Sequence, residues 1–408
     1  MSVIFANCAI LDTVKGELLP GHHVLVEGEL IREVSAGPIH ATDAAILDLG
    51  GRTLMPGLCD AHVHVTAVEA DLTRIDRLSP SYVTARAISV LSGMLRRGFT
   101  TVRDAAGADQ GLAQAVREGI CEGPRILCSG RALSQTGGHG DIRSPGEAAA
   151  DDHSPPKWAL SRICDGVAEA RRAARDELRR GAHQIKIMVS GGVASPSDRV
   201  ANDQFSLDEI RAIVDEAEAV GSYVMAHAYT ARSIRRALEC GVRSIEHGNL
   251  IDEETLDLLK GKGAFLVPTL AVYELLFREG ADAGIPRQVL DKLGDLRERS
   301  LEALGMAMRK GVKVAYGTDL FGTFYEHQSM EFTLRKEVCT PADMIRSATA
   351  TCAELFNMTG RIGVIAPGAY ADLLAIDGDP LQDPGLLQEQ GRYMSVIMKE
   401  GRFVVNRL

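Results

Sequence analysis

An alternation of short apolar segments with amphipathic ones, from about residue 57 to residue 358, constrains the fold of this chain more than any other feature. Eight apolar segments have the length and composition of buried β-strands, and segments with helical periodicity separate them. The strand candidates are 58–65, 99–104, 125–129, 184–189, 223–227, 244–247, 265–268 and 313–318. Eight strand–helix units predict an α/β fold, a parallel (β/α)8 TIM barrel whose active site lies at the carboxyl ends of the strands.

Two of the segments between the strands carry clear signals for the start of a helix. Ser206 is followed by Glu209, which is the spacing of a capping box. Thr340 precedes Pro341, and proline is favoured at the first helical position because it has no backbone N–H to leave unpaired. The sequence therefore predicts helices that begin directly after Ser206 and Thr340.

Both chain ends differ in character from the middle. Residues 3–11, 23–27, 30–34 and 45–49 form short β-like runs separated by glycines, and residues 371–377 and 393–405 repeat that pattern. Neither end is long enough to bury a core alone, so we expect them to pair into one small composite β-sandwich. The predicted domains are 1–56 plus 360–408 for the sandwich and 57–359 for the barrel.

Composition bears on the partners and on the location of the protein. Among 408 residues, 45 Lys and Arg stand against 55 Asp and Glu, which gives a net charge of −10 and disfavours nucleic acid and anionic membranes as partners. The eight cysteines form no Cys-x-x-Cys pair, as expected in a reducing compartment. Because the sequence shows neither a leader pattern nor an apolar run of about 18 residues, we expect a cytoplasmic protein.

Metal-compatible side chains stand at the predicted carboxyl ends of the barrel strands. His62 and His64 are two residues apart, so both face the same side of the first strand. His227 and His247 end the fifth and sixth strands, and Asp319 follows the eighth. A histidine pair alone could also share a polar pocket without a metal. Convergence of all these groups on one barrel mouth predicts a metal centre.

Lys186 lies inside the fourth predicted strand. The two-residue period of a strand turns Ile185 and Ile187 toward the helices and Lys186 toward the barrel interior. A buried ammonium is costly and repels cations, whereas a neutral amine that takes up carbon dioxide becomes a carbamate, a carboxylate-like ligand able to bridge two metal ions. The alternative is an ion pair between Lys186 and a barrel acid such as Asp60 or Asp104.

These residues carry a family resemblance that spans essentially the whole chain. The pattern closely resembles the amidohydrolase superfamily in its binuclear form with a carboxylated lysine, and residues 361–373 resemble that superfamily's return to the terminal sandwich. Within the superfamily, the chain is most similar to the imidazolonepropionase-related group that contains dipeptidases acting on Xaa-Pro or on Xaa-Arg and Xaa-Lys. The resemblance implies two divalent ions, with zinc expected, and the following ligands: His62, His64 and Asp319 for one ion, His227 and His247 for the other, and carboxylated Lys186 as the bridge.

The expected chemistry is hydrolysis by an activated water between two metals about 3.5–4 Å apart. Asp319 is placed to accept the proton of that water and to pass it to the departing amine. By the same resemblance, His139 and Tyr229 contact the substrate carbonyl or its α-carboxylate; the alternatives are a structural loop histidine and a packed tyrosine. Ser190 to Val193 offer backbone N–H groups for a carboxylate.

The sequence thus predicts a metal-dependent hydrolase that cleaves the amide bond of dipeptides or N-acyl amino acids with a free C-terminal carboxylate, with Xaa-Pro favoured. The alternatives are an Xaa-Arg or Xaa-Lys dipeptidase, a mononuclear cyclic amide hydrolase like imidazolonepropionase, and a metal-free binding scaffold like the dihydropyrimidinase-like proteins. Lys186 favours a binuclear site, because a single metal needs no bridge. We expect a homo-oligomer with a small-molecule substrate.

Overall fold

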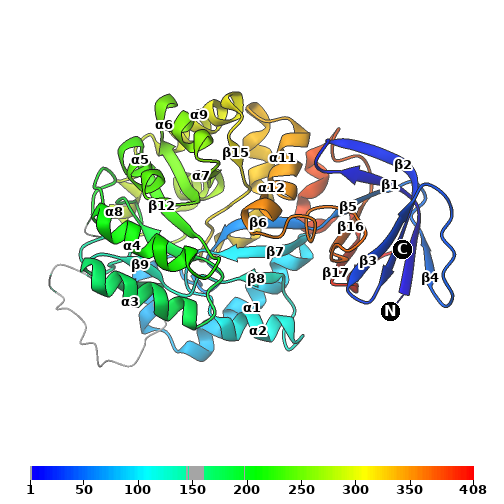
Figure 1. Ribbon diagram of the computed structural model, residues 1–408, viewed down its shortest axis with the longest axis horizontal. Coiled ribbons are helices and arrows are strands. Elements are labelled where there is room, and N and C mark those ends of the chain that lie inside the picture. Colours follow the sequence, from blue (N-terminus) through cyan, green and yellow to red (C-terminus); the bar gives the residue numbers. More distant parts are fainter. Residues whose placement is uncertain (1, 144–145, 147–159, 197) are drawn as a thin grey trace.

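The computed structural model describes residues 2–143, 146, 160–196 and 198–408. Figure 1 shows a large unit of strands and helices beside a smaller, β-rich unit that contains both chain ends. This architecture, a TIM barrel with a β-rich unit built from both termini, confirms the predicted fold class. Across the described ranges, no helix combines the length and hydropathy that a bilayer-spanning helix needs.

All eight predicted barrel strands are present, most of them slightly shorter than the apolar segments that indicated them. Their bounds are β6 (Leu58–Val63), β7 (Phe99–Asp104), β8 (Arg125–Leu127), β11 (Ile185–Met188), β12 (Val224–Thr230), β13 (Ser244–Leu250), β14 (Phe265–Val267) and β15 (Lys313–Val314). Neighbouring strands pair in parallel, so their carboxyl ends meet at one face of the barrel.

Single backbone hydrogen bonds join the two sheets and close the barrel. Strands β6 to β8 form one sheet, and β11 to β15 belong to a second sheet. On one side, the His183 N–H donates to Cys128 O at 2.8 Å, and on the other, the Ala61 N–H donates to Tyr316 O at 2.7 Å. Two short strands that the sequence did not indicate, β9 (Ala132–Ser134) and β10 (Ser161–Ile163), extend the second sheet beyond β11.

The helices cover the outside of the barrel. Both predicted helix starts are confirmed, because Ser206 with Glu209 and Thr340 with Asp343 each form a complete capping box. The α-helices are α1 (Pro80–Arg96), α2 (Gln110–Arg117), α3 (Gly166–Arg179), α4 (Leu207–Glu218), α5 (Ala231–Glu239), α6 (Glu253–Gly261), α7 (Leu270–Glu279), α8 (Arg287–Leu290), α9 (Leu296–Lys310), α10 (Glu331–Leu334), α11 (Pro341–Ser347) and α12 (Ala350–Leu355). The 3-10 helices are η1 (Leu72–Arg77), η2 (Phe324–Met330), η3 (Arg335–Glu337), η4 (Pro384–Leu387) and η5 (Glu389–Gly391).

Strand β11 shows why the side chains divide between the helices and the barrel interior. Ile185, Ile187 and Val189 belong to the hydrophobic cluster that also contains the inward faces of α3 and α4. Gln184 points the other way and donates from its amide to Asp104 O and Leu127 O inside the barrel. The two-residue period therefore places Lys186, between these outward positions, on the interior side.

The smaller unit is one hydrogen-bonded sheet with strands from both chain ends. Its strands are β1 (Ser2–Asp12), β2 (Glu17–Glu27), β3 (Leu30–Ser35), β4 (Ala45–Asp48), β5 (Thr53–Pro56), β16 (Leu373–Ile376), β17 (Met394–Lys399) and β18 (Arg402–Asn406). Strand β5 lies between β16 and β1, and β4 also pairs with β1. The expected pairing of the two ends is present, while the division at residues 56 and 360 stays a prediction.

Gly57 joins this sheet to the first barrel strand in a single residue. Its N–H donates to Asp372 O at 2.8 Å. A Cβ at this position would lie 2.1 Å from the Thr100 hydroxyl oxygen, so only glycine fits here. The close approach packs the start of β6 against Thr100 of β7, and the hydrogen bond to Asp372 ties it to the segment just before β16.

Arg125, at the start of β8, is the principal charged contact between the two units. Its guanidinium donates to Asp372 at 2.8 Å and to Glu400 at 2.6 Å. The arginine side chain is only 15% exposed, and it stacks over the Tyr370 ring at 4.2 Å. Removal of this group would leave two largely buried carboxylates without their partner.

We predict that Arg125→Met lowers the free energy of unfolding by about 3 kcal/mol, because it breaks a largely buried pair of ionic contacts. Urea unfolding followed by circular dichroism measures the change. Arg52→Met is the matched control, since the Arg52–Asp377 pair is 38% and 44% exposed and its loss should cost less than about 1 kcal/mol. Equal effects of the two substitutions would contradict the assignment.

Candidate metal centre

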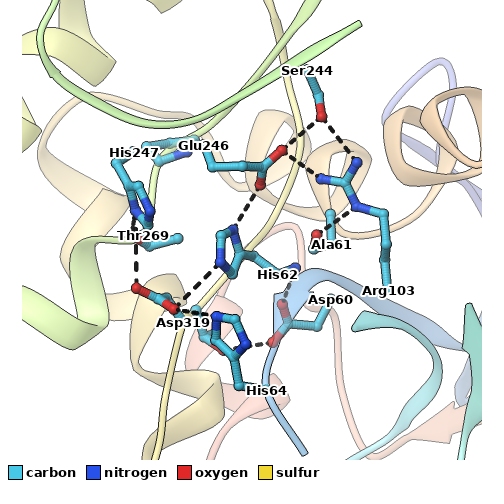
Figure 2. Close-up of polar contacts among 12 residues, drawn as sticks. Asp60, Ala61, His62, His64, Arg103, Ser244, Glu246, His247, Thr269 and Asp319 are labelled. Atoms are coloured by element: carbon cyan, nitrogen blue, oxygen red, sulfur yellow. Dashed lines mark hydrogen bonds and ion pairs between the residues drawn. The ribbon is translucent and has the colours of Figure 1, made fainter. Parts of the chain in front are cut away.

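His62, His64 and Asp319 converge at the carboxyl end of the barrel (Figure 2). Asp319 Oδ1 lies 3.3 Å from His62 Nε2 and 3.1 Å from His64 Nε2. One ligand atom from each of the three residues lies within 4.8 Å of the others, which is compatible with a shared ion. His62 is fully buried, whereas Asp319 keeps 20% and His64 15% of its side chain exposed toward the mouth of the barrel.

The hydrogen bonds of the two histidines leave their Nε2 atoms free for this cluster. His62 Nδ1 lies 2.7 Å from Glu246 Oε2, and His64 Nδ1 lies 3.1 Å from Ala106 O. Both oxygens are acceptors, so each Nδ1 carries a proton and each Nε2 is turned toward Asp319. His62 Nε2 is buried and has no hydrogen-bond partner among the described residues. Two imidazole nitrogens that face a carboxylate oxygen are stabilised by shared protons or by a cation between them, and this donor set fits a divalent metal.

The buried ion pair of Arg103 and Glu246 contacts the Nδ1 side of the His62 ring. Glu246 accepts from Arg103 at 2.9 Å and from the Ser244 hydroxyl at 2.6 Å, and all three side chains are buried (Figure 2). Burial opposes ionisation of Glu246, yet Arg103 and the hydrogen bond from His62 together lower its pKa to about 2. The carboxylate is therefore charged, and it fixes both the tautomer and the orientation of the His62 ring.

His247 lies next to Asp319, and His227 lies on the other side of the His247 ring. His247 Nδ1 is 2.8 Å from the Thr269 hydroxyl and 4.0 Å from Asp319 Oδ2. The rings of His247 and His227 are 4.7 Å apart, and His227 Nε2 lies 3.1 Å from Gly191 O. Burial is the largest cause that lowers the pKa of both histidines well below the ordinary value, so both are neutral, as metal ligands must be.

Lys186 is buried beside these histidines. Its positive charge adds to the effect of burial on the pKa of His227 and of His247. Burial also lowers the pKa of Lys186 itself to about 8, against the attraction of Glu246 and Asp319.

No acid pairs with Lys186 among the described residues. Asp60 accepts hydrogen bonds from Thr318 and Gln328, and Asp104 accepts from the backbone N–H groups of Val65 and Ala108. Neither acid, therefore, forms the ion pair that was the alternative explanation for the buried lysine.

Two of the candidate ligands adopt an unusual backbone conformation. His247 has φ 74° and Asp319 has φ 57°, in the left-handed region that residues other than glycine seldom adopt. Such conformations cost of order 1–3 kcal/mol and concentrate at functional sites. At His247 the conformation breaks the alternation of β13, so that Glu246 and His247 both reach the interior although they are adjacent in sequence.

His139 and Tyr229 lie against the second pair of histidines. The His139 ring stacks on His227 at 4.2 Å, and a Cβ on Gly192 would lie 2.4 Å from it. Tyr229 lies 4.7 Å from the His227 ring, and its hydroxyl oxygen accepts from Tyr273 at 2.9 Å. The Tyr273 hydroxyl also lies 3.3 Å from Asn249 Oδ1, so Tyr229, Tyr273 and Asn249 form one hydrogen-bonded group.

The loop after β11 differs from the prediction. The N–H groups of Gly191 and Gly192, expected to face a substrate carboxylate, donate instead to Asn202 O at 2.9 Å and to Asp198 Oδ2 at 3.2 Å. They are occupied because the loop folds back on residues 198–204 and uses its own donors to hold that fold. The expectation that this backbone binds the carboxylate is wrong for these two residues.

Several supporting residues were not found from the sequence. Asp198 is buried and lies 3.4 Å from both His139 Nδ1 and Lys292 Nζ. Arg103 and Glu246 are charged residues inside barrel strands, a pattern that could have indicated them. Asp198 and Lys292 come from loops, where no sequence period exists to place them.

Several known proteins are similar to this chain over most of its length. The Amidohydrolase family profile matches residues 53–404. An ochratoxinase from Aspergillus niger is 35% identical over 348 residues, which cover 82% of this chain and 72% of the relative. An imidazolonepropionase from Deinococcus radiodurans is 25% identical over 386 residues, covering 87% and 85%. A solved prolidase in complex with N-methylphosphonate-L-proline is 46% identical, covers 100% of both chains and has a TM-score of 0.97.

The family match extends from the β5 strand of the terminal sheet to its last strand, so it includes the whole barrel and every candidate ligand. The predicted family and the predicted hydrolytic activity are both confirmed. This chain belongs to the Amidohydrolase family and is a hydrolytic enzyme.

Proposed function

We propose that this amidohydrolase is a binuclear metal-dependent dipeptidase that cleaves Xaa-Pro and N-acyl-proline amide bonds. The observation that carries the proposal is the converged, buried donor set of His62, His64 and Asp319 in a chain that is 46% identical, over its full length, to a prolidase solved with a proline phosphonate. The phosphonate ligand belongs to that relative, and its substrate class is proposed for this chain.

The proposed ligand set extends the cluster of His62, His64 and Asp319. His62, His64 and Asp319 would hold one divalent ion, with His227 and His247 on the other and carboxylated Lys186 between them. Zinc is the proposed metal because neutral imidazoles and carboxylates are its usual ligands. When bound, the ions supply Lewis-acid polarisation of the scissile carbonyl and a water of lowered pKa.

Side chains at the mouth of the barrel transfer the proton and bind the substrate. Asp319 takes the proton of the attacking water and delivers it to the departing amine nitrogen, as general base and then general acid. His139 and Tyr229 contact the carbonyl oxygen or the α-carboxylate. Because the N–H groups of Gly191 and Gly192 are occupied, carboxylate recognition rests on these two side chains. The homo-oligomer and the cytoplasmic location stay predictions.

We predict that the purified protein binds two zinc ions per chain and that Lys186→Ala loses at least one of them, with a fall in kcat of about 100-fold or more. Elemental analysis and steady-state kinetics measure the two effects. Small carboxylic acids should restore part of both by filling the place of the carbamate. Exposed Lys262→Ala is the control. If Lys186→Ala kept wild-type metal content and turnover, Lys186 would not be the bridging ligand.

Glu246→Gln tests the support behind His62. Loss of the carboxylate should weaken zinc affinity by about 10–100-fold, because the His62 ring loses the charge that fixes its tautomer. Competition with a chromophoric chelator gives the affinity. Glu331→Gln is a matched control: Glu331 is equally buried and pairs with Arg335 at 2.7 Å, and it contacts none of the candidate ligands. An equal loss of affinity in both variants would refute the positioning role.

The substrate prediction compares kcat/KM for Leu-Pro, its C-terminal amide and Leu-Arg on zinc-loaded enzyme. We expect Leu-Pro to be the best substrate and the amide to be at least about tenfold poorer, because a hydrogen bond to a charged group contributes about 1.5–3 kcal/mol. Equal rates for acid and amide would exclude carboxylate recognition. A preference for Leu-Arg would replace proline by a basic residue, and cleavage of cyclic amides alone would favour the imidazolonepropionase-like alternative.

A further inference from the structure

Asp198 is a fully buried carboxylate that lies beside His139. The two residues come from different loops, His139 from the loop after β9 and Asp198 from the loop after β11. Asp198 Oδ2 lies 3.4 Å from His139 Nδ1, and the side chain of Asp198 is 0% exposed. A buried charge is costly unless it is paired, so the groups that face this carboxylate indicate what it does.

Three donors from the loop after β11 meet at this carboxylate. The Ser195 hydroxyl donates to Oδ1, and the Gly192 N–H and the Gln204 amide donate to Oδ2 at 3.2 and 2.9 Å. Burial opposes ionisation of Asp198, yet these surroundings, with the contact to His139 as the largest favourable effect, lower its pKa to about 2. The carboxylate is therefore charged, and it is held in one orientation.

The His139 ring is confined on several sides. One face stacks on His227 at 4.2 Å, and the His139 backbone N–H donates to Gln204 Oε1 at 2.8 Å. A Cβ at Gly192 would lie 2.4 Å from His139 Cε1, so glycine leaves room for the ring. These contacts fix the plane of the ring and its backbone.

The contact with Asp198 adds an orientation within that plane. His139 Nδ1 is buried and has no hydrogen-bond partner among the described residues, and Asp198 is the one acidic side chain of that part of the chain within 4 Å of it. At 3.4 Å the contact is longer than a short hydrogen bond. A buried negative charge still favours a proton on the nearest ring nitrogen, and it turns the Nε2 side of the ring away from Asp198.

Lys292 contacts the other oxygen of the same carboxylate. Its ammonium lies 3.4 Å from Asp198 Oδ1 and donates to Ser195 O at 2.7 Å and to Gly192 O at 3.2 Å. Lys292 therefore fastens the loop after β11 through Oδ1, whereas His139 faces Oδ2. Substitution can separate these two roles of the carboxylate.

We propose that Asp198 is a positioning residue that holds the His139 ring at the substrate and acts on the reaction only through His139. The inference rests on the proposed function, in which His139 contacts the carbonyl oxygen or the α-carboxylate. Positioning of this kind matters because a misplacement of about 1 Å costs about 100-fold in rate. Gly192, Gln204 and Ser195 then serve to hold Asp198 in place.

The first test compares variants of the two loops on zinc-loaded enzyme. Asp198→Asn should lower kcat/KM by about tenfold or more, with the same division between kcat and KM as His139→Ala and with unchanged zinc content. Lys292→Met is the matched control, because it removes a different contact of the same carboxylate, and its kcat/KM should stay within about threefold of the wild type. An equal loss in Lys292→Met and Asp198→Asn would show that Asp198 serves only the loop, and would overturn the proposal.

The second test is a double-mutant cycle. If Asp198 acts through His139, Asp198→Asn should lower kcat/KM by less than about twofold when His139 is already alanine. Losses that multiply in the double variant overturn the proposal. Thermal unfolding shows whether each variant is folded. Asp198→Glu keeps the charge that faces Lys292 while it moves the carboxylate, so the same cycle is measured with this variant if Asp198→Asn does not fold.

The outcomes also separate this proposal from the proposed function. The cycle uses whichever substrate is cleaved fastest among Xaa-Pro and Xaa-Arg dipeptides, N-acyl amino acids and cyclic amides. Preference for a class other than Xaa-Pro or N-acyl-proline overturns the proposed substrate, and the coupling between Asp198 and His139 is still measured. Wild-type kcat/KM in His139→Ala overturns the role of His139 and, with it, that of Asp198. Losses in both single variants that multiply overturn the positioning role alone.

Discussion

The contact of Asp319 with His62 and His64 is the interaction on which the rest of the structure depends. A carboxylate and two imidazole lone pairs face one another at 3.1–3.3 Å, an arrangement that only a cation or shared protons can stabilise. The fold supplies the geometry at a cost, because Asp319 and His247 both adopt left-handed backbone conformations. The parallel strands hold that geometry: His247 lies within β13, and the Asp319 N–H donates to His62 O of β6 at 2.8 Å.

The parts of this architecture that repeat with a fixed period could be predicted from the sequence. The eight barrel strands, both capped helices and the β-rich ends all follow from apolar periodicity and turn residues. The period also placed Lys186 inside the barrel, where burial now accounts for its lowered pKa. Residues of this kind are predictable because the strand itself decides which way they point.

The features that could not be predicted lie in loops or break the two-residue period of a strand. Glu246 and His247 are adjacent, so strict alternation would send one of them outward, and only the left-handed φ of His247 brings both inside. The N–H groups of Gly191 and Gly192 are engaged by residues 198–204, a tertiary contact that a glycine-rich segment does not reveal. Asp198 and Lys292 likewise meet only when two loops fold over the mouth of the barrel.

This division between strands and loops also explains how one family accommodates different substrates. In this chain, the strand ends provide most of the donor set, whereas His139 belongs to a loop and Tyr229 lies two residues beyond His227. Changes in the loops leave the donor set in place, so substrate preference can vary while the chemistry is kept. A prolidase, an ochratoxinase and an imidazolonepropionase all resemble this chain over most of its length, as expected if the barrel fixes the reaction and the loops choose the substrate. Substrate preference in this chain is therefore expected to depend on the loops around the barrel mouth rather than on the candidate ligands at the strand ends.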